Sequence, residues 1–208
     1  RDLAELARDG RVVRVHGGAL RAPRRGSLRP VALRRDEDVE AKRVLARATA
    51  AMVEDGESVI VDSGTTCELV AEELAGRAIR ALCLSLGAAT ALASVPGATV
   101  TVAGGLVDPE SLSLFSTEAV DAVRRFRADV AVLSTCSVSV ADGLTVVESD
   151  DAAVKRAIMT SPRKISRTHA YWFGELADLD LLLTTNDIAP SVLAELREAG
   201  LAVAVHEI

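Results

Sequence analysis

The stretch ESVIVDSGTTCELVAEEL, residues 57–74, decides how the rest of this chain folds. It opens with three β-branched residues at positions 59–61, which are typical of a buried strand. In residues 67–74, leucine and valine recur at helical spacing, with glutamates on the opposite side. The pattern therefore predicts a strand and a helix that are joined by a tight polar turn at residues 62–66.

The turn itself consists of Asp62, Ser63, Gly64, Thr65 and Thr66. A strand that passes through such a turn into a helix points backbone N–H groups outward, and the helix dipole adds positive potential there. Glycine lets the backbone come close to a ligand, and the three hydroxyls offer further hydrogen bonds. This favours an anion site. The alternative is that a threonine of the turn merely caps the helix.

Length and composition indicate a globular protein with one full core. The chain has 208 residues, 49% of them hydrophobic, and no apolar run near the roughly 20 residues that span a bilayer. Its three cysteines are far apart and form no metal-type spacing. We expect reduced thiols, a cytoplasmic location without a secretory signal, no membrane partner, no metal and no cofactor.

Charge is distributed unevenly along the chain. The formal net charge is −6, yet residues 1–35 hold ten arginines against three acidic residues, a net charge of about +7. A basic arm on an acidic body indicates an end that faces nucleic acid. The alternative is a solvated, arginine-rich linker.

Three regions follow from the order of these patterns. Residues 1–20 combine a helix end at residues 2–8 with a short strand in which arginine and valine alternate, followed by a glycine pair. Residues 21–35 contain two prolines and a glycine without a period, which predicts a linker. Residues 36–208 begin with a long amphipathic helix and form the main domain.

Apolar strands of four to seven residues alternate with helices along the main domain. This alternation predicts an α/β fold with a mostly parallel sheet and helices on both faces. Ligands of such sheets bind beyond the carboxyl ends of the strands. After the opening unit, strands are predicted at residues 79–84, 99–103, 129–134, 164–168, 179–184 and 201–206, and helices at 87–94, 118–126, 149–160 and 190–199.

Several short motifs, in order and with fitting gaps, resemble the DeoR family of bacterial transcriptional repressors over nearly the whole chain. They are RDL at residues 1–3, RVHGGA at 14–19, EAKR at 40–43, DSGTT at 62–66, GG at 104–105, DGLT at 142–145 and AVKR at 153–156. The resemblance identifies residues 1–20 as the C-terminal part of a winged helix-turn-helix and residues 36–208 as an effector-sensing domain.

The resemblance also implies a function. Members of the family resemble sugar-phosphate isomerases in fold, and a phosphorylated sugar usually releases them from DNA. We therefore expect a DNA-binding transcriptional repressor, a homo-oligomer and not an enzyme, with operator DNA and an anionic metabolite as partners. By the same resemblance, the DNA-binding residues are Arg1, Arg11, Arg14 and His16. Arg11 and Arg14 lie in the wing rather than on the helix, so we expect them to contact phosphates rather than bases.

The predicted effector site combines the turn with later positions at the same sheet edge. It comprises Asp62, Ser63, Gly64, Thr65, Thr66, Ser85, Gly104, Gly105 and Lys155. Lys155 is one of three lysines and lies in a predicted helix; the alternative is a surface lysine paired with Asp151 at i,i+4 spacing. Asp62 is expected to accept from sugar hydroxyls, or else to order the turn by Asx bonding.

The sequence departs from the family pattern at four places. Leu84-Ser85-Leu86 stands where Thr-Asn-Ser is common, and residues 169–172 read HAYW where Asp-Ser-Ser-Lys is common. Ser116 and Ser134 stand where glycines are usual. These changes predict either a different phosphorylated or acidic metabolite or a pocket that has lost its effector response.

A second function class is an isomerase built on the same sheet. It needs a base beside a bound sugar phosphate, and Glu148 and Asp142 lie in the corresponding region. Neither residue has a recognisable partner, and a basic wing is superfluous to an isomerase. We therefore favour the regulator.

Overall fold

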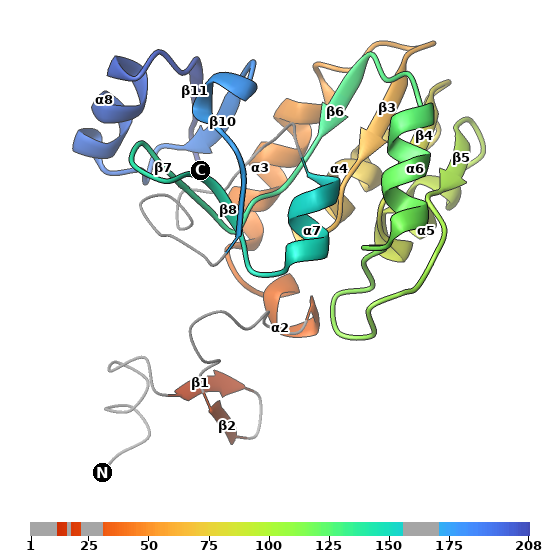
Figure 1. Ribbon diagram of the computed structural model, residues 1–208, viewed down its shortest axis with the longest axis horizontal. Helices are drawn as coiled ribbons and strands as arrows, with labels where there is room; N and C mark the ends of the chain where they lie inside the picture. The colour runs from red at the N-terminus through yellow and green to blue at the C-terminus, as the bar shows by residue number, and fades with distance from the viewer. Residues whose placement is uncertain (1–11, 16–17, 22–30, 156–170) are drawn as a thin grey trace.

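The computed structural model describes residues 12–15, 18–21, 31–155 and 171–208. At its centre lies a four-stranded parallel sheet in the order β5-β4-β3-β6 (Figure 1). Ile60 of β3 lies in register between Leu82 of β4 and Ala131 of β6. The strands are β3 (Ser58–Val61), β4 (Arg80–Cys83), β5 (Thr99–Val102) and β6 (Val130–Val132).

Helices cover both faces of this sheet. Successive side chains of a strand point to opposite faces, so Val59 and Val61 pack in one core cluster and Ile60 in another. The first cluster is completed by α3 (Val39–Ala50), α4 (Thr65–Leu74) and α5 (Leu86–Ala93). The second is completed by α6 (Thr117–Arg125) and the end of α7 (Ser149–Val154). The predicted α/β fold, with a mostly parallel sheet and helices on both faces, is confirmed.

A second lobe packs beside the sheet and has a core of its own, which includes Leu144, Leu182 and Leu196. It lies at the blue end of the chain, to the left in Figure 1. Its elements are an antiparallel sheet of β7 (Ser137–Ser139), β8 (Gly143–Val146) and β9 (Tyr171–Gly174), the 3-10 helix η2 (Leu176–Asp178), a parallel pair of β10 (Leu182–Thr185) and β11 (Val203–His206), and α8 (Pro190–Glu198).

The N-terminal elements are a hairpin and a short helix. The hairpin pairs β1 (Val12–Val15) with β2 (Gly18–Arg21) in antiparallel register. The helix α2 (Val31–Arg35) begins at a buried valine, whose N–H donates to the carbonyl oxygen of Glu110 at 2.9 Å. The stretch predicted as a linker therefore ends in a helix that is attached to the main domain.

Several boundaries differ from the sequence-based expectation. The long first helix begins at Val39, because Asp38 adopts a left-handed conformation with φ of 50° and separates α3 from α2. The helix predicted at 149–160 ends at Val154, and the rest of that range apart from Lys155 lies outside the described residues. The predicted helix at 2–8 and strand at 164–168 also lie outside them.

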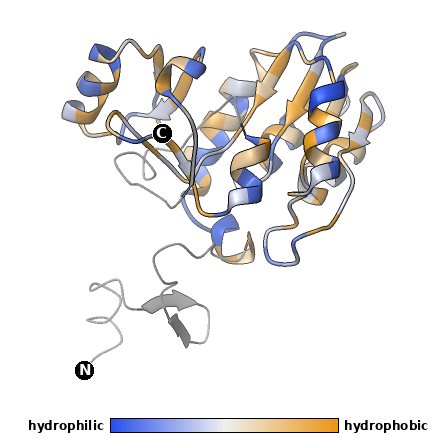
Figure 2. Ribbon diagram, in the orientation of Figure 1, coloured by the Kyte–Doolittle hydropathy of each residue, from blue (hydrophilic) through white to orange (hydrophobic). Residues whose placement is uncertain are grey.

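The hydropathy of the chain follows its layers. In Figure 2 the central strands are mostly orange, while α6 and α8 carry blue surfaces toward solvent. Among the helices of the described ranges, none combines the length and the apolar character needed to cross a membrane.

We predict that Leu92→Ala lowers the free energy of unfolding by about 2–5 kcal/mol, because it leaves a cavity in a packed core. Leu92 is fully buried on α5, in the cluster that covers one face of the sheet. Urea denaturation measures the effect. The matched control Val95→Ala, at a site that is 48% exposed, is expected to change stability by no more than about 0.5 kcal/mol. Equal losses in both variants would contradict this account of the core.

Candidate functional site

The carboxyl ends of the neighbouring strands β3 and β6 meet at Asp62 and Ser134. The N–H of Asp62 donates to Val132 O at 2.9 Å, and the N–H of Ser134 donates back to Asp62 Oδ2 at 2.9 Å. The hydroxyl of Ser134 donates to Ser63 O at 2.7 Å. These bonds fix the turn that follows β3 against the chain that leaves β6.

Lys155 lies at the centre of this edge and is buried, with 3% of its side chain exposed. Its Nζ is 3.0 Å from Asp62 Oδ2 and 3.1 Å from Asp151 Oδ1, and it donates to Ser134 O at 2.9 Å. Asp151 is one turn earlier on α7, so the i,i+4 pair expected of a surface lysine is present, but in the interior. One ammonium group thus joins two buried carboxylates and two sheet strands.

The three charges influence one another strongly. Burial lowers the pKa of Lys155, but the attraction of Asp151 and Asp62 outweighs it, so the pKa lies above its usual value. Burial raises the pKa of Asp151 to about 7; Lys155 opposes this shift, and the charge of Asp62 adds to it. Asp62 accepts a backbone N–H and the ammonium with one oxygen, while its buried Oδ1 has no hydrogen-bond partner within the described residues.

A small cavity of about 20 Å³ lies above this cluster. Two cations contribute to its wall: Lys155 and Arg34, the latter from α2. Burial is the main cause that lowers the pKa of Arg34 from its usual value, which still leaves a guanidinium charged at pH 7. Besides these two, the wall includes Ser63, Gly64, Ser134 and Asp151.

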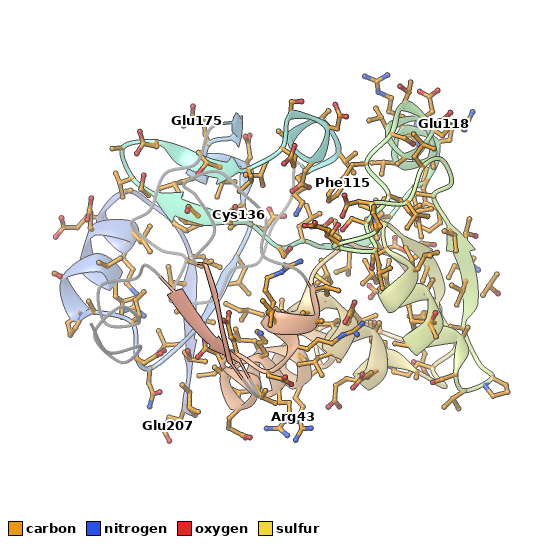
Figure 3. All side chains as sticks on the ribbon, turned by 90° about the horizontal axis from the view of Figure 1, so that it is seen from below. Arg43, Phe115, Glu118, Cys136, Glu175 and Glu207 are labelled. Carbon is orange, nitrogen blue, oxygen red and sulfur yellow. The ribbon has the colours of Figure 1, made fainter. Side chains whose placement is uncertain are left out.

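Figure 3 places two further wall residues, Phe115 and Cys136, near the middle of the molecule. The ammonium of Lys155 lies 5.9 Å from the centre of the Phe115 ring, which shields it from water. The hydroxyls of Ser111 and Ser113 belong to the same wall. The wall therefore combines two cations and several hydroxyls with the carboxyl group of Asp151, and the cations and hydroxyls suit an anion with oxygen atoms.

Gly64 is required at its position for two reasons. It has a φ of 105°, which disfavours other residues, and a Cβ built on it would lie 3.0 Å from Ser134 Oγ. It is the N-cap of α4 and makes no side-chain bond to the first-turn amides. The guanidinium of Arg34 stands over the same point, with one terminal nitrogen 4.0 Å from that Cβ position.

The structure brings some predicted effector residues together and not others. Asp62, Ser63, Gly64 and Lys155 meet as described, and Thr65 and Thr66 form the start of α4. Ser85 is fully buried and caps α5 by accepting from the N–H of Ala88. Gly104 and Gly105 follow β5 and are not part of the cavity wall. The role of each in effector binding stays a prediction.

Sequence reasoning missed two wall residues of consequence. Arg34 falls in the predicted linker, and Asp151 enters the sequence analysis only as the partner of a surface lysine. Ser134, by contrast, follows a strand that the sequence predicts to end at the ligand edge. The i,i+4 spacing of Asp151 and Lys155 in a predicted helix, next to a strand-end aspartate, was the available signal for the ion cluster. No signal in the sequence joined Arg34 to the turn.

Of the predicted DNA-binding residues, Arg14 lies in the middle of β1, opposite Ala19 of β2. Arg1, Arg11 and His16 lie outside the described residues. So do His169 and Ala170 of the altered HAYW segment, while Tyr171 and Trp172 belong to β9.

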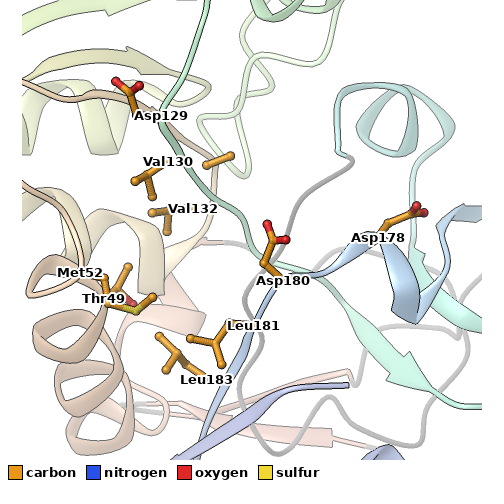
Figure 4. Close-up of a pocket in the computed structure, with 10 residues that line it drawn as sticks. Thr49, Met52, Asp129, Val130, Val132, Asp178, Asp180, Leu181 and Leu183 are labelled. Atoms are coloured by element: carbon orange, nitrogen blue, oxygen red, sulfur yellow. The ribbon is translucent and has the colours of Figure 1, made fainter. Parts of the chain in front are cut away.

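A larger cavity of about 220 Å³ lies between α3, β6 and the start of β10 (Figure 4). Its wall contains apolar residues such as Leu181 and Leu183, and three carboxylates, from Asp129, Asp178 and Asp180. Among the residues that the structure describes, no arginine, lysine or histidine contributes to this wall. Its size exceeds that of the cavity beside Lys155, but its negative charge makes it unsuitable for an anion.

A parallel sheet with helices on both faces defines an α/β domain, with a candidate anion site at the carboxyl edge of the sheet. Residues 37–186 match the DeoR C-terminal sensor domain, and the chain belongs to this family. It is 25% identical to the HTH-type transcriptional repressor GlcR of Bacillus subtilis, over 88% of this chain and 74% of that protein. It is 28% identical to the glycerol-3-phosphate regulon repressor of Escherichia coli, over 79% of this chain and 66% of that protein.

A partial similarity to a solved structure was also found. Ribose 5-phosphate isomerase A of Methanocaldococcus jannaschii is 14% identical to this chain, with a TM-score of 0.42, over 62% of this chain and 55% of that one. Nothing about activity follows from a similarity at this level.

We predict that Asp151→Asn changes how stability depends on pH. The folded protein keeps the Asp151 proton up to about pH 7, whereas an unfolded chain loses it near pH 4. Between these values the folded state binds more protons, so its stability falls as pH rises. The free energy of unfolding of the wild type, minus that of the variant, should therefore decrease from pH 5 to pH 7. Urea denaturation across this range measures it, and a constant difference would contradict the raised pKa.

Proposed function

We propose that this DeoR-family transcriptional regulator is a repressor that senses a phosphorylated sugar or a similar anionic metabolite in the cavity beside Lys155. The chain belongs to a family of transcriptional regulators, and its relatives include named repressors. The proposal extends to operator DNA bound through residues 1–20, with residues 21–35 as the connection and residues 36–208 as the sensing domain. A cytoplasmic location and a homo-oligomeric state belong to the same proposal.

The observation that carries the proposal is the convergence of Lys155 and Arg34 on the turn at Ser63 and Gly64. Both cations are largely shielded from water. An anion in such a site gains more electrostatic energy from them than it would gain in bulk water. The amino end of α4 adds its dipole, and its capping residue offers no side chain that competes for the first-turn amides. A phosphate group would accept hydrogen bonds from the guanidinium of Arg34 and from the first-turn amides, while Lys155, whose ammonium contacts Asp62, Asp151 and Ser134, adds its positive charge.

The rest of a sugar phosphate would meet hydroxyls and acidic oxygen atoms. Asp62 Oδ1 is a buried acceptor without a hydrogen-bond partner within the described residues, and a sugar hydroxyl is a suitable donor for it. Ser111 and Ser113 supply hydroxyls from the opposite wall. That one relative is named a glycerol-3-phosphate regulon repressor supports a small phosphorylated polyol as the class of ligand.

Binding without turnover agrees with the positions of the acidic residues. Glu148 and Asp142 are the candidate bases for an isomerase. Both are exposed, and neither is part of the cavity wall. Asp142 exchanges hydrogen bonds with Ser139 in the turn between β7 and β8. Asp151 is in the wall, where its carboxyl group is held by Lys155 at 3.1 Å.

We predict that sugar phosphates, but not the unphosphorylated sugars, stabilise the protein in a thermal-shift screen. A ligand at 100 times its Kd adds about 2.7 kcal/mol to the free energy of unfolding. NMR of the same mixtures should show no interconversion of the sugars. As a control, Asp180→Asn in the acidic cavity should leave the shift unchanged. Equal stabilisation by sugars without phosphate would contradict the anion site, and turnover would favour the isomerase.

We predict that DNA binding by this regulator weakens steeply with salt. Each neutralised phosphate adds about −0.9 to the slope of log affinity against log salt concentration. Arg14→Ala should reduce the slope by about 0.9, because β1 would lose one phosphate contact. Arg43→Ala, an exposed charge on α3, serves as the control and should leave the slope unchanged. Fluorescence anisotropy with a labelled operator measures both slopes, and equal slopes would exclude the wing contact.

A further inference from the structure

The helix α2 joins the connecting segment to the candidate effector cavity. It spans Val31–Arg35, and nine residues, 22–30, separate it from the hairpin of β1 and β2. In Figure 1 it lies at the lower edge of the main domain, on the side of the hairpin. A change in the position of α2 therefore changes the point from which the connecting segment leaves the domain.

Three contacts attach α2 to the sensing domain at different points. The N–H of Val31 donates to Glu110 O at 2.9 Å, in the loop that precedes Ser111 of the cavity wall. Lys42 donates from Nζ to the carbonyl oxygen of Arg34. Arg35 donates from Nε to Glu68 Oε2 at 3.0 Å and from a terminal nitrogen to Oε1 at 3.3 Å.

The Arg35 contact reaches into the core of the domain. Glu68 is buried on α4, and its carboxylate lies over the first turn of α5, where a Cβ built on Gly87 would be 2.0 Å from Oε1. The carboxylate is therefore held between α2 and α5. The neighbouring residue, Arg34, extends from the same short helix into the cavity wall beside Gly64.

The volume of the cavity limits what can bind in this arrangement. A volume of about 20 Å³ holds roughly one water-sized group, so a phosphate ester does not fit in the cavity as it stands. The wall residues of β3 and β6 are fixed by backbone bonds and by the Lys155 cluster. By contrast, Arg34 comes from a five-residue helix outside the sheet, which is tied to the domain through the contacts of Val31, Lys42 and Arg35 described above. Of the wall elements, α2 is therefore the one that the strands of the sheet do not hold in place.

We propose that Arg34 is a ligand-binding residue of the effector site, and that displacement of α2 by the bound anion is the first step from sensing to release of DNA. This inference rests on the proposed anion site. The anion draws the guanidinium of Arg34 into a new position, and α2 moves with it. The start of the connecting segment then shifts, and with it the orientation available to the DNA-binding end.

The test compares Arg34→Met with the wild type, using inorganic phosphate at pH 8 as the probe. Isothermal titration calorimetry is expected to show phosphate binding that is weakened about tenfold or more, because a charge-assisted bond is lost. Arg43→Met removes an exposed arginine of α3, away from the cavity in Figure 3, and should bind like the wild type. Arg34→Gln gives the same test should the methionine variant fail to fold.

Hydrogen exchange measures the second half of the inference. Saturating phosphate should change the exchange of the amides of residues 31–35 in the wild type, and should change it less in the folded Arg34 variant. If the wild type binds phosphate and the Arg34 variant binds equally well, or if α2 exchange is unaffected, this inference is overturned while the proposed function stands. If phosphate and sugar phosphates all fail to bind the wild type, both are overturned.

Discussion

The buried contact of one ammonium group with two carboxylates is the constraint on which the ligand edge of this domain depends. Lys155 joins Asp62 at the end of β3 to Asp151 on α7, and it also binds the backbone of Ser134 after β6. A buried ion pair gives little net stability. Separating it or removing one partner leaves a buried charge uncompensated, so the geometry of the pair is held tightly. The turn at Gly64 is thereby fixed against its neighbouring strand before any ligand arrives.

In the proposed mechanism, the cavity signals through a fixed floor and a movable wall. The floor is tied together by ions and backbone bonds, whereas the wall that carries Arg34 belongs to a short helix next to the connecting segment. A ligand shifts an equilibrium only if it interacts differently with the two states. A bound anion would meet this condition in the proposed mechanism, since Arg34 moves while Lys155 stays in place.

The sequence predicted those parts of the fold that have regular apolar periods. The β-branched run before Asp62 and the helical spacing after it specified β3, the turn and α4, and the alternation of elements specified the parallel sheet. Sequence patterns failed to predict features that depend on the backbone conformation of a single residue or on a contact between distant parts of the chain. The φ of Asp38 divides the first helix without a glycine or proline, and the serines of β7 mask an antiparallel strand. Arg34 reaches the turn across thirty positions of sequence, which no short-range pattern encodes.

The small volume beside Gly64 has a consequence for the range of concentrations to which the regulator responds. When only the open form binds, the apparent Kd equals the intrinsic one divided by the open fraction. With one molecule in a hundred open, the midpoint of the response lies at a concentration about 100-fold higher. If α2 moves as proposed, the strength with which Arg35 holds Glu68 sets the threshold of induction, and substitutions on the outside of the domain would retune the dose response while the pocket chemistry stays the same.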